Sequence, residues 1–137
     1  MALTHLVDTS VIKRLGHRSV REAVQPLAEA GRVARASISD LEVGYSSRNG
    51  REWDRLIGAL ESLSLVETTS AHVVRAKQVQ RHLASKSQRG RKVPDLLIAA
   101  AAEAEGLVVL HYDRDFDKIA KVTGQRCEWV VPAGSID

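Results

Sequence analysis

Residues 3–10 read Leu-Thr-His-Leu-Val-Asp-Thr-Ser, which places a carboxylate directly after a short apolar run. Leu3–Val7 is predicted to be a buried strand, and Thr9 and Ser10 follow it as turn or N-cap residues. An acid at the carboxyl end of a strand lies where open α/β sheets bind their ligands. Asp8 is therefore a candidate ligand-binding residue, although an ordinary N-cap for the next helix would also explain it.

Apolar runs and turn residues divide the rest of the chain into alternating strands and helices. Gly16, Gly31, Gly106 and Gly124 fall where helices are expected to end, and Pro94 falls where one is expected to begin. This alternation favours an α/β domain with a mainly parallel sheet and right-handed crossovers. The predicted strands are 3–7, 33–38, 65–68, 107–110 and 127–131, and the predicted helices include 11–15, 20–30, 53–63, 70–83, 96–104 and 115–122.

The composition limits the classes of protein to consider. A length of 137 residues is usual for one domain, and we expect residues 1–137 to form a single domain. The single cysteine, Cys127, excludes an internal disulfide and a cysteine-based zinc cluster, so a reducing, cytoplasmic location is expected. No run approaches the roughly 20 apolar residues that cross a bilayer, and no signal-peptide pattern is present, so no membrane association is expected.

Two further acids lie near the predicted starts of helices. A helix is expected to carry residues 41–45, with Ser37 or Ser39 as its N-cap, and Glu42 lies among its apolar side chains. Asp95 precedes an almost wholly apolar helix, where a carboxylate needs a partner or an ion. A surface position for Glu42 and a capping role for Asp95 are the alternatives.

A fourth acid, Asp113, follows the apolar run 107–110, so all four acids lie at changes from one element to the next. Strand ends and helix starts at one edge of a parallel sheet converge, and converging acids repel one another unless a cation lies between them. An all-oxygen site suits Mg²⁺ or Mn²⁺ and disfavours zinc. The alternating acids at 113–117 lack the glycine and closing glutamate of an EF-hand, which argues against a calcium loop. Hydrolysis of a phosphodiester bond is the first chemistry to test.

The stretch from residue 68 to residue 94 contains no acid, although the net charge of the whole chain is only +3. A cationic rim of this kind attracts phosphates by counterion release. A solvated helix face followed by a loop is the alternative. The candidate RNA-binding residues at the end of this stretch are Arg89, Arg91 and Lys92.

As an ordered set, these motifs resemble the PIN-domain family, in particular the VapC toxins of bacterial VapBC toxin–antitoxin pairs. The resemblance covers essentially the whole chain. Many relatives carry threonine at the position of His111, which we interpret here as a strand-end residue rather than as a donor supporting the metal. The matching segments are Leu6-Val7-Asp8-Thr9-Ser10, Ser39-Asp40-Leu41-Glu42, Pro94-Asp95-Leu96-Leu97-Ile98-Ala99-Ala100 and His111-Tyr112-Asp113-Arg114-Asp115-Phe116.

The resemblance implies a three-layer α/β/α sandwich around a short, mainly parallel sheet. It implies a Mg²⁺-dependent endoribonuclease, with Mn²⁺ as a possible substitute, that acts as the toxin of a toxin–antitoxin pair. The implied partners are RNA, a VapB-type antitoxin and, in a homodimer or a toxin–antitoxin hetero-oligomer, a second copy of the chain. The implied catalytic and metal-binding acids are Asp8, Glu42, Asp95 and Asp113, with Asp115 as an auxiliary acid and Ser10 or Thr9 as the auxiliary hydroxyl.

Two other functions remain open from the sequence. One is a metal-dependent phosphatase with Asp8 as nucleophile, although that chemistry usually needs an acid two residues on, where this chain has Ser10. The other is an RNA-binding module without catalysis, against which the presence of all four acids argues. A metal titration coupled to cleavage of structured RNA would separate the three functions.

Overall fold

Five parallel strands form one sheet in the computed structural model, which describes residues 2–87 and 92–137. The strand order is β3-β2-β1-β4-β5. The chain adds β2 and β3 on one side of β1 and then crosses back to add β4 and β5 on the other side. The crevice between β1 and β4 is therefore the topological switch point, where open α/β sheets bind ligands. The strands are β1 (His5–Val7), β2 (Val33–Ala36), β3 (Ser64–Val66), β4 (Val108–His111) and β5 (Cys127–Trp129).

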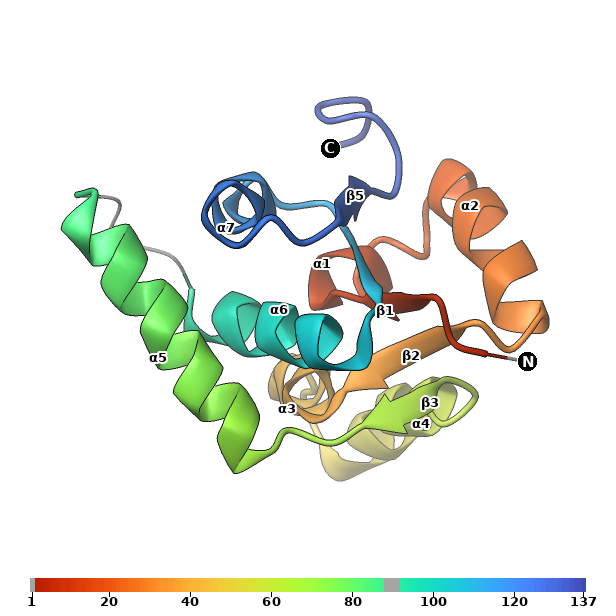
Figure 1. Ribbon diagram of the computed structural model, residues 1–137. Coiled ribbons are helices and arrows are strands. Elements are labelled where there is room, and N and C mark those ends of the chain that lie inside the picture. The colour runs from red at the N-terminus through yellow and green to blue at the C-terminus, as the bar shows by residue number, and fades with distance from the viewer. Residues whose placement is uncertain (1, 88–91) are drawn as a thin grey trace.

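Helices cover both faces of the sheet, which confirms the predicted α/β/α sandwich (Figure 1). α5, α6 and α7 lie on one side of the central strands, and α1 and α2 lie on the other. The helices are α1 (Thr9–Ile12), α2 (Arg18–Glu29), α3 (Ser37–Tyr45), α4 (Gly50–Leu60), α5 (Ser70–Ser85), α6 (Val93–Glu105) and α7 (Asp115–Thr123). In the described part of the chain, no helix combines the length and the apolar character that a membrane span requires.

Alternate residues of each central strand enter two different hydrophobic clusters. Leu6 and Val109 pack with α5, α6 and α7, whereas Val7 and Leu110 pack with α1 and α2. Successive side chains of a strand point to opposite faces, so a strand covered on both faces must be apolar throughout. This requirement explains the unbroken apolar run at residues 107–110, which overlaps β4, and the adjacent Leu6 and Val7 of β1.

The N-terminus of α3 differs from the prediction. The helix begins at Ser37, Ala36 is its N-cap, and no side chain caps it. Neither serine is available for capping, because Ser37 Oγ accepts a hydrogen bond from Thr68 N at 3.1 Å and Ser39 Oγ lies 3.0 Å from Thr9 Oγ1. The predicted serine cap was therefore wrong, and Glu42 lies in the middle of α3 rather than near its start.

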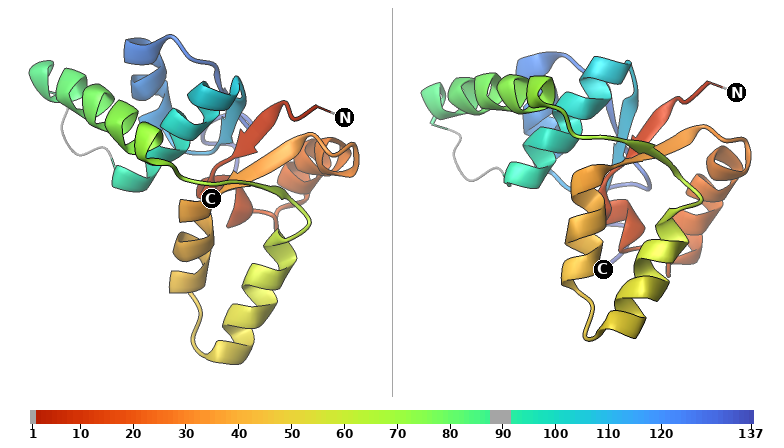
Figure 2. Two further views of the ribbon diagram at one scale, coloured as in Figure 1. Left: turned by 60° about the horizontal axis from the view of Figure 1, so that its bottom comes forward. Right: turned by 90° about the horizontal axis from the view of Figure 1, so that it is seen from below.

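The α3–α4 hairpin extends away from the sheet (Figure 2). Asn49 is the N-cap of α4, and its side chain accepts a hydrogen bond from Glu52 N at 2.9 Å. The apolar stripe predicted along residues 53–63 is only partly covered, since Leu60 is its only buried residue. On α3, 93% of Tyr45 and 70% of Leu41 are exposed, so the hairpin presents apolar surface to its surroundings.

Candidate metal centre

The four acids predicted from the sequence line one pocket of about 230 Å³ at the switch point. Asp8 directly follows β1, and Asp113 lies two residues beyond the end of β4. Asp95 comes from the first turn of α6, and Glu42 comes from the middle of α3. Thr9, Ser10, Lys13, Arg14, Lys92 and Tyr112 complete the lining.

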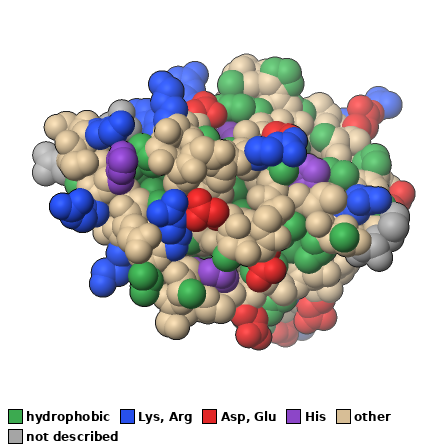
Figure 3. Space-filling model, in the orientation of Figure 1, with side chains coloured by type: hydrophobic (Ala, Val, Ile, Leu, Met, Phe, Trp, Pro, Cys, Tyr) green, Lys and Arg blue, Asp and Glu red, His purple; other side chains and the backbone are tan. Residues whose placement is uncertain are grey.

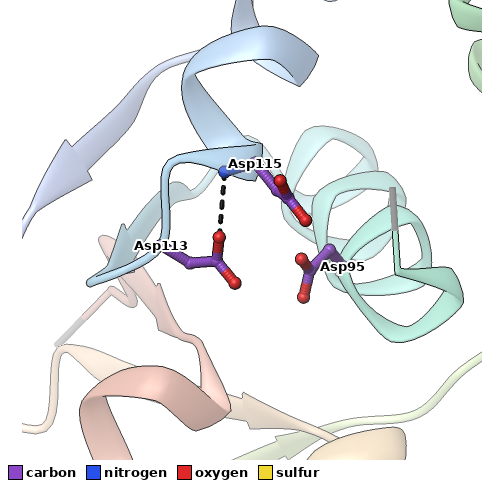
Figure 4. Close-up of side chains that lie close together, drawn as sticks. All are labelled: Asp95, Asp113 and Asp115. Atoms are coloured by element: carbon purple, nitrogen blue, oxygen red, sulfur yellow. Dashed lines mark hydrogen bonds between the residues drawn. The ribbon is translucent and has the colours of Figure 1, made fainter. Parts of the chain in front are cut away.

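Three of the acids near this pocket form the tightest cluster. One oxygen from each of Asp95, Asp113 and Asp115 lies within 4.8 Å of the other two, and the three carboxylates point toward a common space (Figure 4). Asp113 Oδ1 accepts a hydrogen bond from Asp115 N at 2.9 Å, which fixes the loop after β4. Asp8 and Glu42 line the same pocket but lie outside this close group.

The two most buried acids carry oxygens that lack partners. Asp8 is 2% exposed and Asp95 is 4% exposed. Within the described residues, Asp8 Oδ1 and Asp95 Oδ2 are buried and have no hydrogen-bond partner. An unpaired buried carboxylate oxygen is costly, and a bound cation removes that cost. These oxygens therefore fit a metal site, because Mg²⁺ and Mn²⁺ take oxygen ligands.

Repulsion and burial act together on these two acids. Burial raises the pKa of Asp95 to about 8, and the charges of Asp8 and Asp113 add to this effect. Burial also raises the pKa of Asp8, although the hydrogen bonds from Ser10 oppose the shift. Without a cation, burial and mutual repulsion therefore favour the protonated form of Asp95.

Thr9 and Ser10 organise the pocket by different contacts. Thr9 Oγ1 donates to Glu42 Oε1 at 2.7 Å and so connects α1 to α3. Ser10 Oγ accepts a hydrogen bond from Tyr112 N at 2.9 Å and so connects α1 to the segment after β4. Both predicted hydroxyl residues line the pocket, and each fixes the position of a neighbouring element.

The basic residues expected to bind RNA are only partly described. Arg89 and Arg91 lie outside the described residues. Lys92 Nζ lies 3.0 Å from Asp113 Oδ2, and this contact raises the pKa of the lysine. Lys92 therefore balances an acid of the pocket. Figure 3 shows further Lys and Arg side chains along the side of the molecule that α5 forms.

His111 ends β4 and is fully buried. Its ring packs between Phe116 and Trp129, with centroid distances of 4.9 and 5.0 Å. Nδ1 accepts a hydrogen bond from Asp113 N at 3.2 Å, and burial lowers the pKa of the imidazole to about 4. His111 is thus the expected strand-end residue, and it also holds the backbone of Asp113.

Lys13, Arg14 and Tyr112 are residues of the pocket that the sequence reasoning missed. The available signal was two consecutive cations five and six residues after Asp8, because a short helix can return such side chains toward the strand end that precedes it.

The PIN domain model matches residues 5–122 of the chain. The chain belongs to the PIN-domain family. Over 137 residues, covering all of both chains, it is 66% identical to Ribonuclease VapC51 of Mycobacterium tuberculosis (strain ATCC 25618 / H37Rv). It is also 43% identical to Ribonuclease VapC21 of that strain, over 98% of this chain and 99% of the relative.

A solved structure supports the PIN-domain fold. DNA-bound VapBC from Salmonella typhimurium matches with a TM-score of 0.76 at 24% identity, over 94% of this chain and 99% of the other. At that identity the likeness shows the fold alone. It agrees in fold class with the PIN-domain match.

Proposed function

We propose that this chain is a metal-dependent endoribonuclease of the VapC type, the toxin of a toxin–antitoxin pair, and that the pocket at the β1–β4 crevice is its active site. The observation that carries the proposal is the pair of buried oxygens of Asp8 and Asp95 that find no partner among the described residues, beside the cluster with Asp113 and Asp115. The 66% identity to a ribonuclease supports RNA as the substrate. Mg²⁺, with Mn²⁺ as a substitute, is the proposed cation because all the candidate ligand atoms are oxygens.

The residues of the pocket have distinct proposed roles. Asp8, Asp95, Asp113 and Asp115 would hold the cation, which when bound polarises a phosphate and activates a water molecule. Glu42, held by Thr9 Oγ1 at 2.7 Å, faces the same pocket as the remaining catalytic acid. Lys92 offsets the charge of Asp113.

The phosphatase alternative has less support from this geometry. It would need an acid two residues after Asp8, but Ser10 occupies that position and its hydroxyl accepts a hydrogen bond from Tyr112 N. The second acid of that chemistry is therefore missing, and Ser10 instead connects α1 to the segment after β4.

The proposed protein partner is a VapB-type antitoxin, which binds the apolar surface of the α3–α4 hairpin. Leu41, Tyr45 and Trp53 are exposed there by 70%, 93% and 45%. Large exposed apolar side chains of this kind mark interaction surfaces. Both proteins are proposed to act in the cytoplasm, where RNA is the available substrate.

A second apolar area is the proposed contact with another copy of this chain. A groove of about 160 Å³ lies between α5 and α6, and its lining includes Val73, Val93 and Leu97. Val73 is 44% exposed and Val93 is 60% exposed. Homodimer or hetero-oligomer assembly would cover these side chains.

Cleavage of a structured RNA during a Mg²⁺ titration tests the proposed activity. Asp95→Asn should abolish cleavage, because the amide keeps the size of the side chain but removes the charge that the cation needs. The matched control is Asp54→Asn on the exposed face of α4, which should cut at the wild-type rate. An Asp95→Asn protein that cuts RNA as fast as the control would contradict the proposal. Sequencing the new 5′ ends that the wild-type protein produces identifies the cleavage sites.

A further inference from the structure

The acidic pocket poses a charge problem for any RNA that enters it. Four carboxylates line the pocket, and each phosphate of the RNA is also negative. Three cationic side chains, Lys13, Arg14 and Lys92, line the same pocket. Lys92 is already paired with Asp113 at 3.0 Å. Lys13 and Arg14 are therefore the cations of the pocket that are not paired with one of its acids.

Arg14 is held in one orientation by contacts with three parts of the chain. Its Nη1 donates to Ser10 O at 2.9 Å. Its Nε donates to Asp137 Oδ2 at 3.0 Å, and Nη2 lies 2.9 Å from the same oxygen. The centre of the guanidinium group lies 4.9 Å from the centroid of the Tyr112 ring. Only 26% of the side chain is exposed.

Asp137 is itself anchored by its neighbours. Tyr112 Oη donates to Ile136 O at 2.7 Å and accepts from Ile136 N at 3.2 Å. The side chain of Ile136 packs against the hydrophobic cluster of α1 and α2. Residues 132–137 are thus tied to the segment after β4, and they hold Arg14 beside the pocket.

The held guanidinium retains hydrogen-bonding capacity. An arginine carries five N–H donors, and each of the two terminal nitrogens carries two of them. Within residues 2–87 and 92–137, the contacts with Ser10 and Asp137 leave a further N–H on both Nη1 and Nη2. Two donors on neighbouring nitrogens match two oxygens of a phosphate. Because the side chain is already ordered, little conformational entropy is lost when a phosphate binds.

We propose that Arg14 binds a phosphate of the RNA backbone at the acidic pocket, in an orientation set by Asp137, Tyr112 and Ser10. This inference rests on the proposed cleavage of RNA at that pocket. The proposed phosphate contact is made by a residue outside the acid-free stretch 68–94, which contains the RNA-binding residues predicted from the sequence. Lys13 adds positive charge to the same wall from an exposed position.

Equilibrium binding of a labelled single-stranded RNA tests this inference without any divalent metal. Affinity is measured in EDTA over a series of salt concentrations. Arg14→Gln should weaken binding and reduce the slope of log affinity against log salt by about 0.7, the value for one phosphate contact on a single strand. Arg14→Lys should keep the wild-type slope but bind more weakly, because lysine has the charge without the planar fork.

The matched control is Arg18→Gln, which removes one cation from the exposed end of α2, where Arg18 pairs with Glu22. An Arg14→Gln protein with the affinity and slope of this control would overturn the inference. Should Arg14→Gln unfold, Arg14→Lys decides, and wild-type affinity in that variant overturns the inference. Failure of the proposed function looks different, since the wild-type protein would then not cut RNA with Mg²⁺, whether or not it bound RNA in EDTA.

Discussion

Asp8 combines two roles that its sequence context presents as alternatives. Its Oδ2 accepts a hydrogen bond from Ser10 N at 2.9 Å, as an N-cap does, while its Oδ1 is buried without a partner in the described chain. One carboxylate is thus both the cap of α1 and a candidate ligand. The sequence predicted Asp8 as a site residue. It did not predict that the two carboxylate oxygens have different roles, because that depends on how the side chain is oriented within the packed crevice.

Arg14 could not be selected from the sequence for a related reason. Its orientation depends on Tyr112 and Asp137, which lie about a hundred residues further along the chain. Contacts between such distant residues follow from the tertiary fold and leave no local pattern. The acids were easier to predict because each one lies at a strand end or a helix terminus that the local sequence marks.

The raised pKa of Asp95 makes the stability of the metal-free protein depend on pH. Asp95 has a pKa of about 8 in the fold, against 3.8 for the ordinary side chain. A raised folded-state pKa contributes stability that is fully present below the unfolded value and is lost as pH rises through the folded value. We therefore expect the Tm in EDTA to fall as the pH rises from 5 to 9, as measured by thermal unfolding.

Two comparisons test whether the pH dependence of the Tm comes from the acidic pocket. Asp95→Asn should flatten the fall of Tm, because the amide has no proton to lose. Mg²⁺ should raise the Tm of the wild-type protein most at high pH, where the ligands are ionised and repel one another. Equal slopes of Tm against pH for the two proteins in EDTA would assign the dependence to other groups.

At the scale of the elements, the sequence predicted the five strands and most helix ends. Gly106 and Gly124 end α6 and α7 with φ of 68° and 74°, as their positions indicated. The predicted start of α3 was wrong because its two serines bond to other elements rather than to their own helix. Capping predictions fail where tertiary partners compete for the hydroxyl group.

α6 couples the packing of the core to the position of Asp95. Ala101 and Ala102 are fully buried between the sheet and α5, and their small side chains permit close approach. Ala101→Leu should therefore lower the free energy of unfolding by about 1–3 kcal/mol through overpacking. The control, Ala104→Leu at an exposed position of α6, should change it by less than about 0.5 kcal/mol. Urea denaturation of the two variants measures the difference, and equal stabilities would contradict this account of the helix.

At the scale of the whole molecule, exposed apolar side chains gather on the projecting α3–α4 hairpin and along α5. The sequence predicted an apolar stripe on α4 but did not distinguish core from interface, because a stripe of either kind has the same spacing. The structure makes the distinction, since Tyr45 is 93% exposed and Trp53 is 45% exposed on the projecting hairpin.

Tyr45→Ala should weaken antitoxin binding while the stability of the free protein stays unchanged. An exposed tyrosine contributes little to the fold, but an aromatic side chain in an interface is often worth about 2 kcal/mol, or roughly 30-fold in Kd. Titration calorimetry with a VapB-type antitoxin measures the effect. The control is Val74→Ala, which truncates a 56% exposed side chain on α5. Equal losses of affinity in both variants would place the antitoxin elsewhere.

The central position of β1 also sets the order in which the acidic pocket is completed during translation. His5 pairs with Val108 across the sheet, so the first strand leaves the ribosome long before its neighbour β4. Pairing between distant segments waits until both have been synthesised, and domains generally fold as units. Asp8 and Asp113 therefore meet only after β2, β3 and α6 have emerged. The acidic pocket is therefore not assembled while most of the chain is still being synthesised.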